Sequence, residues 1–135
     1  LLEGRALNIT QQNDIALARK TMVALGALDV GQAVVVQAGR VLAIEAAEGT
    51  SEMLRRAASL VDLGESAAVM VKVPKSGQHR KLDVPVIGVA TIEEAAAAGI
   101  GVIALQAGGV LFADAAPQLF KAAAAHGLTL FGLEA

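Results

Sequence analysis

The residues with the clearest capacity for chemistry lie between Met70 and Gly88, in the stretch MVKVPKSGQHRKLDVPVIG. Four of the chain's 11 basic residues stand within it, followed by one acid. These residues are Lys72, Lys75, Arg80, Lys81 and Asp83. Because α/β sheets bind ligands at the loops that follow their strands, cations clustered after an apolar strand favour an anion such as phosphate. A solvated basic loop without a ligand is the alternative.

Three residues of this stretch carry specific expectations. Lys72 alternates with apolar residues on a strand, so its ammonium needs either an anion or an exposed strand end. Asp83 could bond the turn at Pro85, or it could bind Mg²⁺ and orient water beside a phosphate. His79 is expected to be an exposed loop histidine, with a phosphate contact as the alternative.

A second candidate for phosphate binding is the turn Glu48-Gly49-Thr50, which joins an apolar strand to a helix. Free backbone N–H groups in the first turn of a helix, together with the helix dipole, attract a phosphate. Helix capping by Thr50 and Ser51 explains the same residues without a ligand. Glu45 and Glu48 are either solvated loop carboxylates or metal ligands that act through water.

Apolar periodicity and glycine placement predict the elements that position these residues. Residues 11–25 form a helix stopped by Gly26, and AVVVQ and VLAIE form a β-hairpin that turns at Ala38-Gly39. Three further helices are expected: one from Thr50, capped by its hydroxyl; one from Thr91 to Gly99, with a Thr91–Glu94 capping box; and one from Ala115 to His126, with His126 as its C-terminal cap. Further strands are expected at residues 68–73, 84–87, 100–105, 110–113 and 128–133.

The order of these elements predicts an α/β fold: a mixed sheet with an early β-hairpin, covered by helices. At 135 residues the chain suits a single domain, residues 1–135. The uncharged run from Ala95 to Ala113 is long enough for a membrane span, but its glycines and amphipathic beginning favour the interior of a soluble α/β domain. No signal peptide is expected at the first residues.

The composition excludes several classes of protein. A net charge of −2 and an aromatic content of 2% argue against nucleic-acid binding, which uses basic grooves and stacked rings. The absence of cysteine excludes disulfides and thiolate zinc sites.

Two longer stretches resemble a known family. LGALDVGQAVVVQAGRVLAIEAAEGTSEMLRR and VKVPKSGQHRKLDVPVIGVATIEEA are similar to the C-terminal domain, also called DUF1009, of LpxI-type UDP-2,3-diacylglucosamine pyrophosphohydrolases. The likeness extends over residues 2–132. Its motifs follow one order: Gly-Gln before the hairpin, Glu-Gly-Thr at the helix start, Lys-x-x-Lys, and then Gln before Asp-x-Pro.

The resemblance implies an enzyme of lipid A biosynthesis. The family hydrolyses the pyrophosphate of UDP-2,3-diacylglucosamine to UMP and 2,3-diacylglucosamine 1-phosphate, with Mg²⁺ or another divalent metal. The chain would be the C-terminal catalytic half of a two-domain enzyme, with the substrate bound between it and an N-terminal domain. The implied location is the cytoplasm, and a position at the periphery of the inner membrane and a homo-oligomer are both compatible with it.

The motifs assign roles to particular residues. Asp83 matches the acid of Asp-x-Pro and is the expected catalytic residue and a metal ligand, with Glu48 as a second expected metal ligand. The expected phosphate- or substrate-binding residues are Gly49, Thr50, Lys72, Lys75, Gln78 and Lys81. The sequence departs from the family pattern at Ser51 and His79, where the family carries Asp, so Asp83 is the acid that remains.

Two other classes of function stay open. One is a non-enzymatic module that binds a nucleotide or an anion, and the other is a structural dimerisation domain of a larger enzyme. An enzyme should depend on Mg²⁺ and on Asp83, whereas a binding module should bind UMP without metal and tolerate the loss of that acid.

Overall fold

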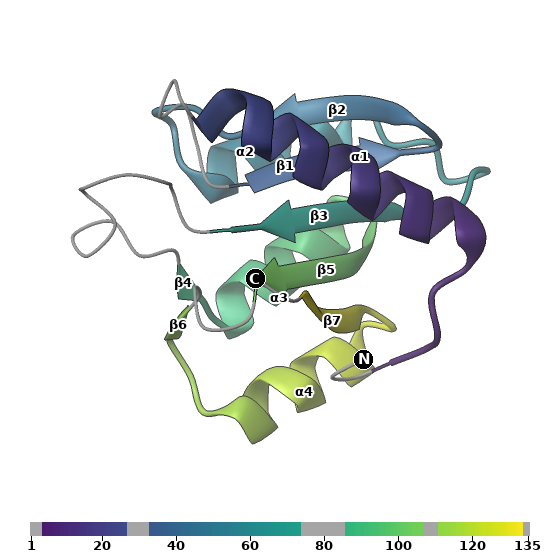
Figure 1. The fold of residues 1–135 in the computed structure, drawn as a ribbon. Coiled ribbons are helices and arrows are strands. Elements are labelled where there is room, and N and C mark those ends of the chain that lie inside the picture. The colour runs from purple at the N-terminus through teal and green to yellow at the C-terminus, as the bar shows by residue number, and fades with distance from the viewer. Residues whose placement is uncertain (1–3, 27–32, 74–85, 107–110, 134–135) are drawn as a thin grey trace.

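Five strands form the central sheet of the protein, whose computed structural model describes residues 4–26, 33–73, 86–106 and 111–133 (Figure 1). The strands are β1 (Ala33–Gln37), β2 (Arg40–Ile44), β3 (Ala68–Lys72), β5 (Ile100–Gln106) and β7 (Thr129–Leu133). Their order across the sheet is β2-β1-β3-β5-β7. β1 runs antiparallel to both of its neighbours, whereas β3, β5 and β7 are parallel. The predicted mixed α/β sheet with an early β-hairpin is therefore confirmed.

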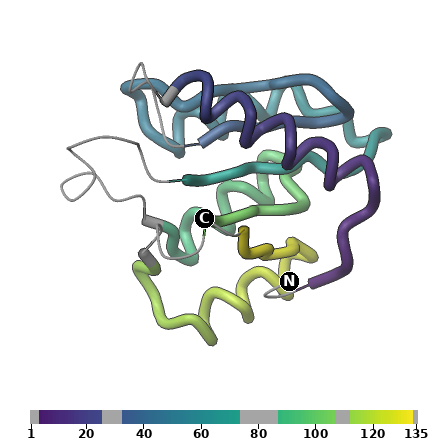
Figure 2. Tube along the Cα trace, in the orientation of Figure 1, coloured from purple at the N-terminus to yellow at the C-terminus, as the bar shows by residue number. Residues whose placement is uncertain are grey.

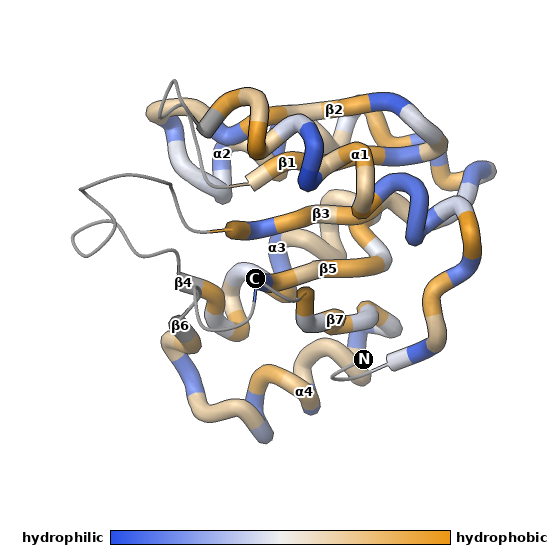
Figure 3. Tube along the Cα trace, viewed as in Figure 1, coloured by the Kyte–Doolittle hydropathy of each residue, from blue (hydrophilic) through white to orange (hydrophobic). Residues whose placement is uncertain are grey.

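Helices cover both faces of this sheet (Figure 1). α1 (Ile9–Gly26) packs on one face, and α2 (Thr50–Ala58), α3 (Val89–Ala97) and α4 (Ala116–Ala125) pack on the other. In β3, Ala68 and Met70 pack with α2, α3 and α4, while Val69 and Val71 pack with α1, because alternate residues of a strand point to opposite faces. All residues of β1 and β3 are buried, which explains the continuous apolar runs that Figure 3 shows along the sheet.

The predicted β-hairpin joins β1 and β2 through Ala38 and Gly39. Both residues have positive φ angles, 49° and 79°, which a two-residue turn matched to the twist of the strands requires. Asp14, from α1, is buried, and its carboxylate accepts hydrogen bonds from the N–H groups of Ala38 and Gly39 at 3.0 and 2.9 Å. The turn is therefore held by α1 as well as by the freedom of its glycine.

α2 begins at Thr50 as predicted, but Thr50 does not cap it. Gly49 is the N-cap residue, and no side chain caps the first turn. The hydroxyl of Thr50 is instead bonded to Glu45 and Lys72. The predicted cap is therefore wrong, because Glu45, at the end of β2, and Lys72, in β3, engage the hydroxyl.

α3 begins at Val89, two residues before the predicted start at Thr91. The N–H of Val89 donates to the Asp114 carboxylate at 2.9 Å, and the hydroxyl of Thr91 accepts a hydrogen bond from the N–H of Gly88 at 3.4 Å. The predicted capping box of Thr91 with Glu94 is therefore wrong. A distant acid fixes the beginning of this helix.

A second sheet has two parallel strands, β4 (Val86–Ile87) and β6 (Leu111–Phe112). Figure 1 shows it on the side toward which β3 and β5 point. The N–H of Ala113 donates to the carbonyl of Ile87 at 2.7 Å, which continues this pairing. β4 leads directly into α3, and β6 is followed by α4.

The C-terminal ends of α1 and α4 agree with the sequence, whereas α1 begins at Ile9, two residues before its predicted start. α1 ends at Gly26, and His126 is the C-terminal cap residue of α4, as predicted. The stretch before α1 lies against β7, where the N–H of Arg5 donates to the hydroxyl of Thr129 at 3.1 Å (Figure 2). None of the helices in the described ranges is long and apolar enough to cross a membrane.

Candidate functional site

Two strands and a helix bring part of the predicted site together at one edge of the sheet. β2 and β3 run in the same direction because β1 is antiparallel to both, so they end at the same edge. Glu45 follows β2, and Lys72 is the last residue of β3. α2 begins beside them, with Gly49 and Thr50 at its start. Residues that are far apart in the sequence therefore meet at the carboxyl ends of two strands.

Lys72 is buried at this edge, with 4% of its surface exposed. Its Nζ donates a hydrogen bond to Oγ1 of Thr50 at 2.9 Å. An ammonium has three N–H donors, and no described residue other than Thr50 accepts a hydrogen bond from this one. The strand end is not exposed, and Glu45 supplies a negative charge near the ammonium; a bound anionic ligand stays a prediction.

Burial lowers the pKa of Lys72 below the ordinary value of lysine, because removal from water disfavours the charged form. The negative charge of Glu45 acts in the opposite direction and favours the ammonium. A bound anion next to Nζ would favour the ammonium in the same way. The charged form of this lysine would therefore be stabilised by an anionic ligand.

Glu45 belongs to the same cluster, although the sequence favoured a solvated loop carboxylate. Glu45 is buried, with 8% of its surface exposed, and its carboxylate accepts a hydrogen bond from the hydroxyl of Thr50 at 3.2 Å. The solvated interpretation is wrong for this residue. Its alternation with Ala43, which is buried, is the sequence signal that could have placed its side chain under α2. We call these three side chains the Glu45–Thr50–Lys72 chain.

Glu48 lies at the surface of the same turn and is engaged by protein groups. Its carboxylate forms an ion pair with Arg56 of α2 and accepts a hydrogen bond from the N–H of Ala46 at 3.4 Å. Arg56 also donates to the carbonyl of Ile44 at 3.0 Å. Hydrogen bonding from the backbone N–H of Glu48 itself, and then from Arg56, holds the pKa of Glu48 below its ordinary value. Arg56 and Ala46 both bond Oε1, so Arg56 competes with a metal ion for one oxygen of this carboxylate and not for the other.

The described residues taken alone do not fit a carboxylate metal centre. Nowhere in residues 4–26, 33–73, 86–106 and 111–133 do three or more His, Cys, Asp or Glu side chains gather so that they could hold a metal ion. Glu48 is paired with Arg56, and Glu45 is bonded to Thr50. Asp83, the other expected ligand, lies outside the described residues. A metal site at this edge therefore stays a prediction from the sequence.

The other predicted site residues follow β3 in the sequence. Lys75, Gln78, His79, Lys81 and Asp83 all lie outside the described residues. Their expected roles stay predictions. Of the predicted set, the structure brings together Gly49, Thr50 and Lys72, and it places Glu48 nearby in a surface ion pair.

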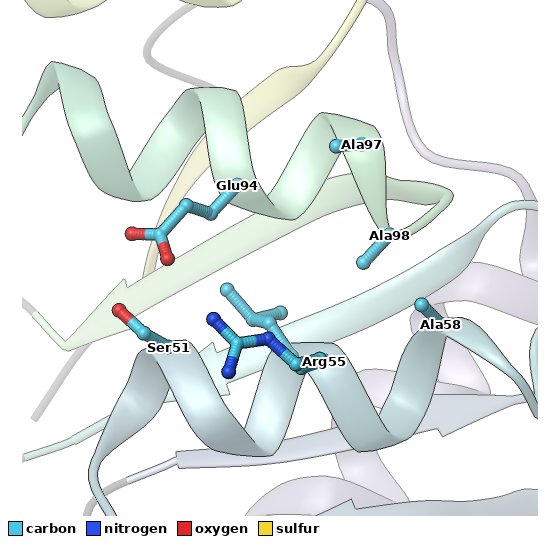
Figure 4. Close-up of a pocket in the computed structure, with 7 residues that line it drawn as sticks. Ser51, Arg55, Ala58, Glu94, Ala97 and Ala98 are labelled. Carbon is cyan, nitrogen blue, oxygen red and sulfur yellow. The ribbon is translucent and has the colours of Figure 1, made fainter.

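An open groove runs between α2 and α3 next to this cluster (Figure 4). It is lined by Ser51, Leu54, Arg55, Ala58, Glu94, Ala97 and Ala98. In Figure 4, Glu94 faces Ser51 and Arg55 across the groove. Ser51 follows Thr50 directly, so one end of the groove adjoins the Glu45–Thr50–Lys72 chain.

The fold and this edge place the protein among α/β domains with a polar site at the carboxyl ends of their strands, beside the first turn of a helix. The chain belongs to the LpxI C-terminal domain family, whose model matches residues 1–131. The resemblance predicted from the sequence motifs is thereby confirmed.

A curated relative from Caulobacter vibrioides carries the name UDP-2,3-diacylglucosamine pyrophosphatase LpxI. The two chains are 44% identical over 125 residues, which cover 89% of this chain and 44% of the relative. The chain therefore spans less than half the length of that relative.

Proposed function

We propose that the protein hydrolyses the pyrophosphate bond of UDP-2,3-diacylglucosamine to UMP and 2,3-diacylglucosamine 1-phosphate, in lipid A biosynthesis. In this proposal residues 1–135 are a single α/β domain that acts as the C-terminal half of a two-domain enzyme. The name of the Caulobacter relative supports the substrate and the reaction. The observation that carries the proposal is the buried ammonium of Lys72 beside the first turn of α2.

The first turn of α2 would bind phosphoryl oxygens through its backbone. N–H groups at the start of a helix have no carbonyl partner within the helix, and the dipole there favours negative charge. Gly49 precedes this turn with a φ of 86°, a conformation that glycine adopts without steric cost. The backbone at Gly49 and Thr50 would therefore present donors that are oriented before the substrate arrives, as stabilisation of a developing charge requires.

Lys72 would supply the positive charge at this edge. Negative charge spreads over the phosphoryl oxygens in the transition state, and a cation already in place stabilises it. We propose that Lys75, Gln78 and Lys81 add contacts from the segment after β3, and that Asp83 orients the attacking water. Dependence on Mg²⁺ or another divalent metal is part of the proposal, with Glu48 as a ligand through the carboxylate oxygen that Arg56 does not bond.

The proposed enzyme acts in the cytoplasm at the periphery of the inner membrane, because its substrate carries two acyl chains. The groove between α2 and α3 offers exposed apolar surface from Ala58 and Ala97. Apolar surface of this kind suits the hydrocarbon part of such a substrate.

The test measures release of UMP from UDP-2,3-diacylglucosamine by the complete protein, with Mg²⁺ and after chelation by EDTA. We expect turnover with Mg²⁺ that EDTA abolishes. Lys72→Ala should lower kcat/KM by about 100-fold, the loss that follows removal of one stabilising group at a reacting centre. Lys121→Ala, at an exposed position of α4, is the matched control and should leave kcat/KM unchanged.

Two outcomes would contradict the proposal in different ways. Residues 1–135 alone should show little turnover, so robust activity of this piece would refute the two-domain arrangement. Binding of UMP by the complete protein in EDTA, without cleavage of the nucleotide sugar under either condition, would identify a nucleotide-binding module instead of an enzyme.

A further inference from the structure

A row of three residues, Lys72, Ala33 and Glu45, crosses the carboxyl edge of the sheet under α2. Lys72 of β3 pairs with Ala33 of β1, and the N–H of Glu45 donates to the carbonyl of Ala33 at 2.9 Å. Neighbouring strands lie about 4.8 Å apart, so the backbones of Glu45 and Lys72 are separated by about 10 Å. Ala33 is fully buried between them and carries only a methyl group. The row therefore leaves space between the acid and the lysine.

The hydroxyl of Thr50 links the two charged groups. It donates to Glu45 at 3.2 Å and accepts from Lys72 at 2.9 Å. A hydroxyl has one hydrogen, and here that hydrogen is directed at Glu45. A phosphoryl oxygen only accepts hydrogen bonds, so in this arrangement Thr50 can serve a phosphate through its backbone N–H but not through its side chain.

We propose that Glu45 is a positioning residue of the site, which acts through Thr50 to direct the ammonium of Lys72. This inference rests on the proposed function. Glu45 fixes the direction of the hydroxyl hydrogen, and the hydroxyl then presents a lone pair to Lys72. The ammonium is held at the start of α2, where its other donors share one edge of the sheet with the N–H groups of the first helical turn. Glu45 itself does not touch the substrate.

Loss of the carboxylate would remove this fixed direction while keeping the shape of the site. An amide in place of Glu45 carries two N–H donors and one acceptor, so it can donate to Thr50 as well as accept from it. Thr50 could then direct its hydrogen toward the ammonium of Lys72, where two donors oppose each other. Partners that orient a functional side chain in this way typically change activity by about 10- to 100-fold when they are replaced.

The first experiment is steady-state kinetics of the complete protein with UDP-2,3-diacylglucosamine. Glu45→Gln should lower kcat by about 10- to 100-fold. Its KM should stay unchanged or fall, because removal of a negative charge near the site favours an anionic substrate. Lys72→Ala should raise KM as well as lower kcat, so the two variants separate positioning from direct binding. Glu65→Gln, an exposed acid in the turn before β3, at the opposite end of that strand from Lys72, is the matched control and should leave both constants unchanged.

Variants of Thr50 test the link between the two charged groups. Thr50→Val keeps the shape without the hydroxyl and should reproduce the fall in kcat, whereas Thr50→Ser should keep most of the activity. The double variant Glu45→Gln/Thr50→Val should be no slower than the slower single variant, because both changes act through one hydroxyl. The Tm of each variant confirms that the fold is intact.

The outcomes distinguish this role from the proposed function. Unchanged kcat in Glu45→Gln, or losses that multiply in the double variant, would overturn the role of Glu45 while the proposed function stands. A raised KM with unchanged kcat in Thr50→Val would mean that the hydroxyl binds the substrate directly, which also overturns the role. No cleavage by the unmodified protein would overturn the proposed function, and this role with it.

Discussion

Replacement of Lys72 by methionine should abolish anion binding at the carboxyl edge of the sheet while the protein stays folded. Methionine is unbranched and flexible, and can fill the space of this buried side chain. Burial is the larger cause of the lowered pKa of Lys72, and attraction to Glu45 is the smaller, opposing one. Replacement by methionine therefore removes the larger, unfavourable effect of burying the charge together with the smaller, favourable attraction to Glu45.

The expected change in the free energy of unfolding follows from these opposing effects. Removal of the burial penalty of Lys72 favours methionine, whereas the buried Glu45 loses the ammonium that attracts it. Truncation of one member of a fully buried ion pair costs about 3–5 kcal/mol, and loss of the hydrogen bond to Thr50 costs about 1 kcal/mol. Because burial is the larger of the two effects on Lys72, we expect its removal to offset part of these losses, so that the free energy of unfolding at neutral pH falls by less than about 3 kcal/mol.

The pH dependence of this difference has a definite sign. The pKa of Lys72 is lower in the folded protein than the ordinary value of 10.5, so the unfolded chain binds more protons between those two values. The stability of the unmodified protein should therefore rise with pH through that window. The Lys72→Met variant lacks this rise. Its free energy of unfolding should therefore fall relative to that of the unmodified protein as the pH approaches about 10.

The assay combines urea unfolding of the complete protein at pH 7 and at about pH 10 with calorimetric binding of inorganic pyrophosphate at pH 7. Lys121→Met, at an exposed position of α4, is the control and should change the stability by less than about 0.5 kcal/mol. A loss of about 3 kcal/mol or more in Lys72→Met would show that the ammonium is a structural partner of Glu45. That result would refute an anion site built on Lys72.

Asp83→Ala in the complete protein should remove most turnover and retain the affinity for UDP-2,3-diacylglucosamine, measured by calorimetry. The expected role of this carboxylate is at the reacting phosphorus, so a parallel loss of affinity would contradict that role. Asp114→Ala should lower the free energy of unfolding by about 1 kcal/mol, the contribution of a helix cap, and an unchanged urea midpoint would show that the bond to Val89 adds nothing. Asp14→Asn should cost about 1–3 kcal/mol, because asparagine offers one acceptor oxygen to two N–H groups of the hairpin turn; a smaller loss in this variant than in Asp114→Ala would contradict that reasoning.

The sheet and helices were predictable because their signals are local. Gly39 permits the hairpin turn, and Gly26 marks the end of α1. The continuous apolar residues of β1 and β3 indicate strands buried on both faces. The family resemblance was equally accessible, because it rests on the order of short motifs along the sequence.

The site was only partly predictable, because its contacts join distant residues. A threonine before a helix favours capping in any sequence, and the bonds that Thr50 makes instead depend on Glu45 at the end of β2 and on Lys72, 22 residues later. The burial of Glu45 likewise depends on α2 packing over the end of β2. Alternation indicated the face to which Glu45 and Lys72 point, but not that one hydroxyl would join them.

The cap on α3 has a consequence for the order in which the protein folds. Asp114 lies 25 residues after Val89, and β5 stands between them in the chain. The first turn of α3 therefore gains this bond only when two residues that are 25 apart in the chain have come together. We expect this bond to form after the folding transition state, because closure of that loop costs chain entropy before the bond is made. Loss of Asp114 should therefore mainly speed unfolding and leave the folding rate almost unchanged, so that this acid contributes to the kinetic persistence of the native fold.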